Sequence, residues 1–199
     1  MKFIAAYDEC NVQYGCLSVM DAAALEDSKA VNFLHFEGPH WCQGFAWMPG
    51  TVNFLMLNND CELSSAFVEV YLSDHIELCP DTIRAIQVPF SVGRLGVCIP
   101  NDGARIISGT ATKLPSRQKI AIPVPSGQYA LVCEMKFRDD EEYLNSERYR
   151  QNNEVGLTDM WCRLIFVAQE DAPPAILRAD EFLNLERYGG TFLMEAEEA

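Results

Sequence analysis

The chain has 199 residues, of which 49% are hydrophobic and 22% charged, with a formal net charge of -14. This is the composition of a globular protein long enough to bury its own core, and it excludes the disordered class. Direct nucleic-acid binding is not expected either, because gripping phosphates requires clustered Lys and Arg.

Short segments rich in Val, Ile, Phe and Tyr, separated by Gly, Pro, Asn and Asp, fill the first two thirds of the sequence and predict strands. In the first part these are residues 11–20, 31–36, 44–48, 51–57 and 67–72. Residues 21–27 predict a helical turn capped by Asp21. Because residues 67–72 carry apolar groups on both faces, they predict a central strand.

The middle of the chain continues this pattern with expected strands at residues 85–90, 96–100, 104–108, 118–124 and 129–135. Pro89 and Pro123 are expected at a sheet edge or strand end, because proline has no N–H to donate. Alternating apolar residues on either side of the turn at 125–128 predict that both sides contribute to one sheet and its core. The residues concerned are Val88, Phe90, Ile120, Ile122, Tyr129 and Leu131.

The last third changes character. Acids followed by arginines in residues 139–150 suit the dipole of a short helix, residues 160–167 return to strand, and residues 180–188 predict a second helix ended by Gly189. The fold class predicted is mainly β, an antiparallel β-sandwich with short peripheral helices. We expect one domain over residues 1–199, in which residues 139–199 contain an acidic segment and a C-terminal helical appendage.

Eight cysteines are scattered along the chain without a Cys-x-x-Cys pair or a zinc-finger histidine. This spacing predicts no bound metal and no other cofactor. The sequence begins without a secretory leader, which favours reduced thiols and a cytoplasmic location. No apolar run reaches 18 residues, so no membrane segment is expected.

No catalytic residue is predicted. The histidines His35, His40 and His75 lack the i, i+4 spacing of a helical metal site, and no nucleophile elbow, phosphate loop or dinucleotide fingerprint is present.

Acidic residues supply the candidate binding sites. Residues 30–83 contain no Lys or Arg, and a second dense cluster occupies residues 139–142. Such one-signed stretches project a negative field toward a basic partner, although solubility or a helix dipole would also explain them. The candidate partner-binding residues are Asp60, Glu62, Asp74, Glu77, Asp139, Asp140, Glu141 and Glu142.

Aromatic residues offer a different interpretation. Trp41, Phe45, Trp47 and Phe54 could form a platform for a sugar ring, whereas aromatics that alternate along a strand are more often part of a core.

Val88-Pro89-Phe90 and the run Ile-Ala-Ile-Pro-Val-Pro-Ser-Gly-Gln-Tyr-Ala-Leu at residues 120–131 resemble the competence protein J family. The similarity covers about residues 83–134, with a fainter echo after Asn11. A longer loop at 101–117, the acidic segment after Arg138 and the C-terminal helix lengthen this chain relative to the family pattern. The resemblance implies a stoichiometric inhibitor of a DNA-entry nuclease, with no catalytic residues of its own.

Charge and resemblance together lead to one functional hypothesis, an immunity-type protein that binds and neutralises a nuclease toxin through an acidic surface. The expected partner is therefore a basic protein, with no nucleic acid bound directly. The alternatives are a ligand- or carbohydrate-binding β-sandwich module at Trp41 or Trp47 and, third, an unrecognised hydrolase.

Overall fold

The fold is taken from a computed structural model. It describes residues 1–12, 16–26, 45–48, 50–55, 64–100, 105–109, 112–114, 119–137 and 160–179. The expected segments at 31–36, 139–150 and 180–188 lie outside these residues, and the single domain over residues 1–199 stays a prediction.

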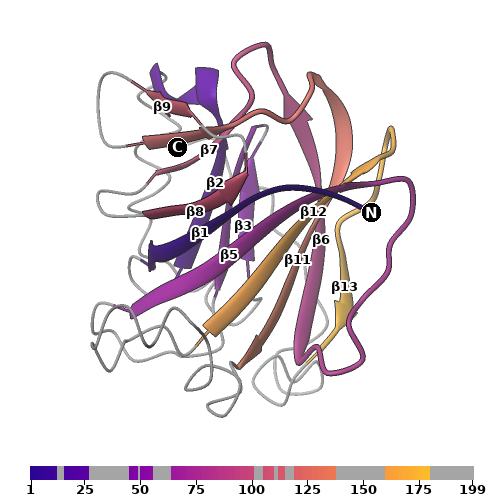
Figure 1. The fold of residues 1–199 in the computed structure, drawn as a ribbon. Coiled ribbons are helices and arrows are strands. Elements are labelled where there is room, and N and C mark those ends of the chain that lie inside the picture. The colour runs from indigo at the N-terminus through magenta and orange to yellow at the C-terminus, as the bar shows by residue number, and fades with distance from the viewer. Residues whose placement is uncertain are drawn as a thin grey trace, which may run out of the picture.

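In the part of the chain that the structure describes, the strands form two β-sheets (Figure 1). The large sheet has seven strands, in the spatial order β13 (Ala175–Arg178), β6 (Arg84–Val92), β11 (Gly127–Phe137), β12 (Met160–Ala168), β5 (Ser64–Ser73), β1 (Lys2–Val12) and β8 (Arg105–Gly109). The small sheet has six, in the order β3 (Phe45–Met48), β4 (Thr51–Leu55), β2 (Cys16–Asp21), β7 (Val97–Pro100), β10 (Lys119–Ile122) and β9 (Thr112–Leu114).

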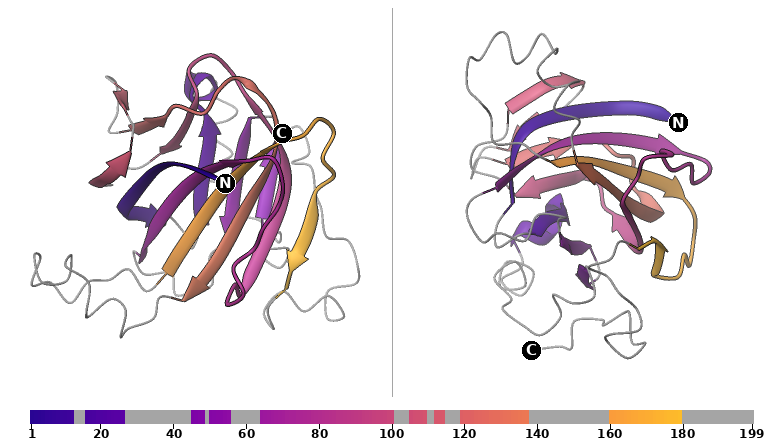
Figure 2. Two further views of the ribbon diagram at one scale, coloured as in Figure 1. Left: turned by 45° about the vertical axis from the view of Figure 1, so that its right-hand side comes forward. Right: turned by 90° about the horizontal axis from the view of Figure 1, so that it is seen from below.

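The core lies between the sheets, which Figure 2 shows as two layers. Strand β12 illustrates why, because its side chains alternate between two faces. Met160, Cys162, Leu164 and Phe166 join the core shared with the small sheet. Ile165 and Val167 point the other way, into a second apolar cluster on the outer face of the large sheet, which Tyr71 and Leu78 cover in part. The mainly β, sandwich-like fold is therefore confirmed.

The predicted capped turn is also confirmed. Residues Ala22–Glu26 form a short 3-10 helix, η1, and the backbone N–H of Ala23 donates to Asp21 Oδ1 over 2.7 Å. The other oxygen of Asp21 accepts the N–H of Gly93. One buried carboxylate thus joins the end of β2 to the turn between β6 and β7.

One prediction about strand pairing is wrong. Tyr129 and Leu131 do pair with Phe90 and Val88 in the large sheet, but Ile120 and Ile122 belong to β10 of the small sheet, where they pair with β7. The chain therefore crosses from one sheet to the other between β10 and β11 instead of forming a hairpin there. Ile122 still meets the other four side chains in the shared core, because an apolar alternation specifies burial and leaves the strand partner open.

Three further differences concern strand boundaries and direction. The expected strand at 11–20 corresponds to the end of β1 and to β2, which extends to Asp21. No strand was predicted for most of β1, for β9 or for β13. The pair β5–β12 is parallel within otherwise antiparallel sheets. The proline predictions hold, since Pro123 follows the end of β10 and Pro89 lies beyond the part of β6 that pairs with β13.

Candidate protein-binding surface

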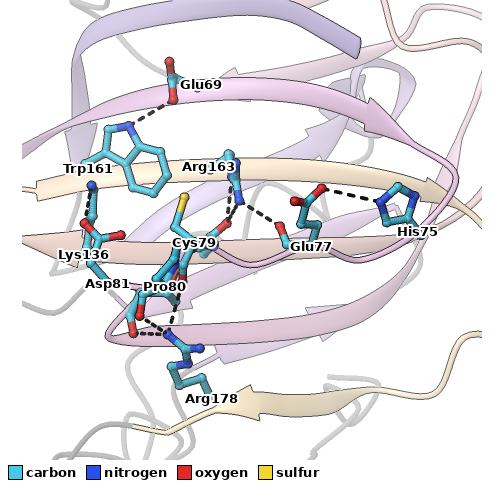
Figure 3. Close-up of polar contacts among 12 residues, drawn as sticks. Glu69, His75, Glu77, Cys79, Pro80, Asp81, Lys136, Trp161, Arg163 and Arg178 are labelled. Carbon is cyan, nitrogen blue, oxygen red and sulfur yellow. Dashed lines mark hydrogen bonds and ion pairs between the residues drawn. The ribbon is translucent and has the colours of Figure 1, made fainter. Parts of the chain in front are cut away.

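The outer face of the large sheet carries polar and aromatic side chains from three adjacent strands (Figure 3). Strand alternation turns them away from the core, because their neighbours in sequence point into it. They are Glu69 and Tyr71 on β5, Trp161 and Arg163 on β12, and Glu134 and Lys136 on β11.

Glu134 and Arg163 form a buried ion pair on this face. Arg163 Nη2 lies 2.6 Å from Glu134 Oε2, and the two side chains are 9% and 0% exposed. The other carboxylate oxygen, Oε1, accepts the backbone N–H of Cys79 at 2.5 Å and the hydroxyl of Thr82. Arg163 Nη2 also donates to the carbonyl of Glu77 at 2.8 Å. Both buried charges are thus paired and hydrogen-bonded, which offsets the cost of taking them out of water.

These bonds hold the connection between β5 and β6 against the outer face. Arg178 on β13 holds the same connection from the other side, because its Nη1 donates to the carbonyls of Cys79, Pro80 and Thr82. The connection is therefore anchored to β11 and β12 by Glu134 and Arg163 and to β13 by Arg178, while its side chains at Asp74, His75, Ile76 and Glu77 stay exposed.

Glu69 and Trp161 form a second polar pair beside the first. Trp161 Nε1 donates to Glu69 Oε2 over 3.0 Å. The Lys136 ammonium lies 4.9 Å from the centre of the Trp161 ring, and the Arg163 guanidinium lies 5.7 Å from it. Lys136 also pairs with Asp81 at 2.6 Å. Lys136 and Arg163 are thus already engaged by Asp81 and Glu134.

Glu69 itself lacks an ion pair with any residue that the structure describes. Burial raises the pKa of its carboxyl, and the hydrogen bond from Trp161, followed by the charge of Arg163, lowers it in part. A half-buried carboxylate with only neutral donors in contact is costly to keep charged.

Two aromatic rings, Tyr71 on β5 and Phe3 on β1, extend this surface from β5 onto β1. Tyr71 lies beside Glu69 on β5, and the Phe3 ring packs edge-on against it with centroids 5.6 Å apart. Phe3 is 41% exposed, so this aromatic contact faces solvent.

Two of the predicted acidic residues meet around one histidine. His75 Nδ1 lies 2.5 Å from Asp74 Oδ1 and Nε2 lies 3.5 Å from Glu77 Oε2. The hydrogen bond with His75 lowers the pKa of Asp74. The Asp74 and Glu77 side chains are 90% and 66% exposed. Asp60, Glu62, Asp139, Asp140, Glu141 and Glu142 lie outside the described residues.

Sequence reasoning missed Glu69, Tyr71 and Trp161 as members of one surface. The alternation of residues 160–167 was a usable signal, since it puts Trp161 and Arg163 on the face opposite Met160 and Cys162. The proximity of Glu69 was not readable, because it depends on the parallel pairing of β5 with β12.

Two of the four aromatic residues considered as a sugar-binding platform belong to the core instead. Trp47 packs against the core between the sheets and Phe54 is fully buried, as the core interpretation predicted. Trp41 and the side chain of Phe45 lie outside the described part of the chain.

The described residues provide neither a metal site nor a membrane-spanning helix. No group of three His, Cys, Asp or Glu side chains in these ranges is arranged to hold a metal ion. None of the helices found there has the length and apolarity needed to cross a membrane.

Comparison with known proteins gives a family assignment. Among solved structures the fold is similar to the crystal structure of ComJ from Bacillus subtilis, the inhibitor of the DNA-degrading activity of NucA. That match has a TM-score of 0.48 and 16% sequence identity, and it covers 84% of this chain and 98% of that chain. No curated protein matches the chain. The family model for competence protein J (ComJ) matches residues 10–167, and the chain therefore belongs to the competence protein J family.

Proposed function

We propose that this protein binds a DNA-degrading nuclease and inhibits it, without catalysing a reaction of its own. The observation that carries the proposal is the family match over residues 10–167, since the ComJ of Bacillus subtilis inhibits the DNA-degrading activity of NucA. A nuclease that holds DNA presents basic side chains to its substrate. The acidic character of this chain, with its net charge of -14, is complementary to such a partner.

The partner we propose is a nuclease related to NucA from the same cell, in the manner of an immunity protein and its toxin. Exposed acids are the natural contacts for it, with Asp74 and Glu77 as one candidate group. Asp60 and Glu62, and the run from Asp139 to Glu142, remain the other candidates.

A DNA-degradation assay tests this proposal. The purified nuclease is incubated with linear DNA and increasing amounts of this protein, and we expect degradation to stop near a one-to-one ratio. Charge reversal of each acidic group in turn, for example Asp74→Lys with Glu77→Lys, identifies the group in contact. Undiminished degradation at a large excess of the wild-type protein would refute the proposed function.

We also propose a cytoplasmic location. In its support, Cys10, Cys79, Cys98, Cys133 and Cys162 are free thiols, and burial raises the pKa of Cys10 and of Cys133, which keeps both protonated and unreactive. Titration of freshly prepared protein under denaturing, non-reducing conditions should give eight free thiols. Fewer than eight would contradict the assignment to a reducing compartment.

A further inference from the structure

We infer that Glu69 and Trp161, bordered by Tyr71 and Phe3, form the anchor of the nuclease interface, where Glu69 receives an arginine of the basic partner. This inference rests on the proposed function and names the surface that performs it. The exposed Asp74 and Glu77 lie on the connection that leaves the same strand, β5, and they would guide the approach.

The first argument compares two carboxylates on the same face. Glu134 is satisfied within the chain, because Arg163, Cys79 and Thr82 all bond to it. Glu69 accepts hydrogen bonds from neutral donors, the indole N–H of Trp161 and the hydroxyl of Tyr71, and has no ion pair within the described residues. A half-buried carboxylate left in this state does not serve folding. It is, however, prepared for a guanidinium, whose fork of donors matches a carboxylate that still has free lone pairs.

The second argument is the ring of aromatic side chains around this carboxylate. Trp161 is half-buried, held by its bond to Glu69 and by the Lys136 cation over its ring. Tyr71 and the exposed Phe3 continue the surface. Trp, Tyr and Arg are the residues most enriched at the energetic centres of protein interfaces, and surrounding apolar contacts exclude water from such a centre. The aromatic rings would strengthen the charge pair in this way.

The third argument is charge complementarity, which identifies the occupant as a basic protein surface. Residues 64–83 contain Glu69, Asp74, Glu77 and Asp81 and no Lys or Arg. Lys136 and Arg163, which reach this face from the neighbouring strands, are engaged by Asp81 and Glu134. Among the described residues, Glu69 has no ion-pair partner and the largely exposed Asp74 and Glu77 share one histidine, His75, so the face offers negative charge beside its rings.

The test measures the inhibition constant against the NucA-related nuclease for Glu69→Gln and Trp161→Ala. We expect each variant to weaken inhibition by about 30-fold or more, the range of an interface centre. Glu170→Gln is the matched control, because it removes one carboxylate charge from an exposed turn after β12 and should leave the constant within about twofold. Circular dichroism and thermal unfolding confirm that each variant is folded.

Glu69→Gln decides the outcome, since its amide oxygen keeps one acceptor for the Trp161 indole, while the negative charge and the second acceptor oxygen that a guanidinium would use are lost. A wild-type protein that inhibits, together with a Glu69→Gln variant that inhibits equally well, would overturn the anchor and leave the proposed function standing. A wild-type protein that does not inhibit overturns the function and the anchor with it. A double-mutant cycle supports the anchor further. The nuclease arginines are replaced one at a time, and replacement of the arginine that faces Glu69 should weaken inhibition by the wild-type protein but cause no further loss of inhibition by the Glu69→Gln variant.

Discussion

At the scale of single residues, the outer face of the large sheet carries two carboxylates with different roles. Glu134 is needed for folding, whereas the fold does not need Glu69. Glu134 lies at the centre of a buried, fully bonded network, whereas Glu69 is half-buried beside neutral donors. The two acids occupy adjacent parts of one surface, so substituting each by glutamine separates folding from binding.

Glu134→Gln should destabilise the protein by about 3–5 kcal/mol, because it leaves the buried Arg163 guanidinium without a charged partner. Urea unfolding followed by circular dichroism gives the free energy of unfolding. Asp81→Asn is the control, since its ion pair with Lys136 is largely exposed on the Asp81 side, and such a pair contributes about 0–1 kcal/mol. Equal losses in the two variants would contradict the role assigned to the buried pair.

Glu69→Gln should raise the melting temperature at neutral pH. Burial raises the pKa of Glu69 in the folded protein, so the folded state holds this proton more tightly than the unfolded chain does. Protonation therefore favours folding below the unfolded pKa, and this contribution is lost as pH rises through the folded pKa.

The advantage of the glutamine variant should consequently be largest near pH 7 and shrink as the pH falls toward the ordinary glutamate pKa of about 4.3. Melting curves of both proteins across this pH range provide the measurement, with Glu170→Gln as the reference variant. A melting temperature lower than wild type at pH 7 would show that Glu69 supports the fold after all.

At the scale of secondary-structure elements, the turn between β6 and β7 is fixed by one glycine. Gly96 has φ +77, and a Cβ at this position would lie 2.6 Å from the carbonyl oxygen of Ile122 on β10. A side chain here would therefore both adopt a strained backbone conformation and push β7 away from its neighbour.

We expect Gly96→Ala to cost about 1–3 kcal/mol from the backbone strain alone. Gly127→Ala offers the comparison, because its Cβ would approach nothing closer than the Tyr129 ring at 3.4 Å, and we expect a change below about 1 kcal/mol. Thermal unfolding of the two variants side by side tests the prediction, which fails if Gly96→Ala melts with the wild-type protein.

At the scale of the whole molecule, the net charge of -14 should govern how fast the protein meets its partner. The association rate with the nuclease, measured by stopped flow, should fall as salt is raised, because the Debye length is about 10 Å at 0.1 M ionic strength. The reversal of Asp74 and Glu77 should lower this rate and weaken its salt dependence, whereas Trp161→Ala should act mainly on dissociation. A rate that is insensitive to salt would remove the electrostatic part of the proposal.

The sequence by itself determined the class of the fold and most of its strands. Apolar alternation and turn residues suffice for this, because burial of one face of a strand is a local property that the chain repeats every second residue. Asp21 as a cap and Pro123 at a strand end follow from equally local chemistry, and the acidic character follows from counting.

Only the tertiary structure decided which strands are neighbours. Ile120 and Ile122 show the limit, since their pattern fits either sheet and the crossing between β10 and β11 places them in the small one. The same holds for the candidate interface, because Glu69 and Trp161 are 92 residues apart and meet through the parallel pairing of β5 with β12. Such a pairing is stabilised by the whole sheet, and no stretch of sequence around either residue records it.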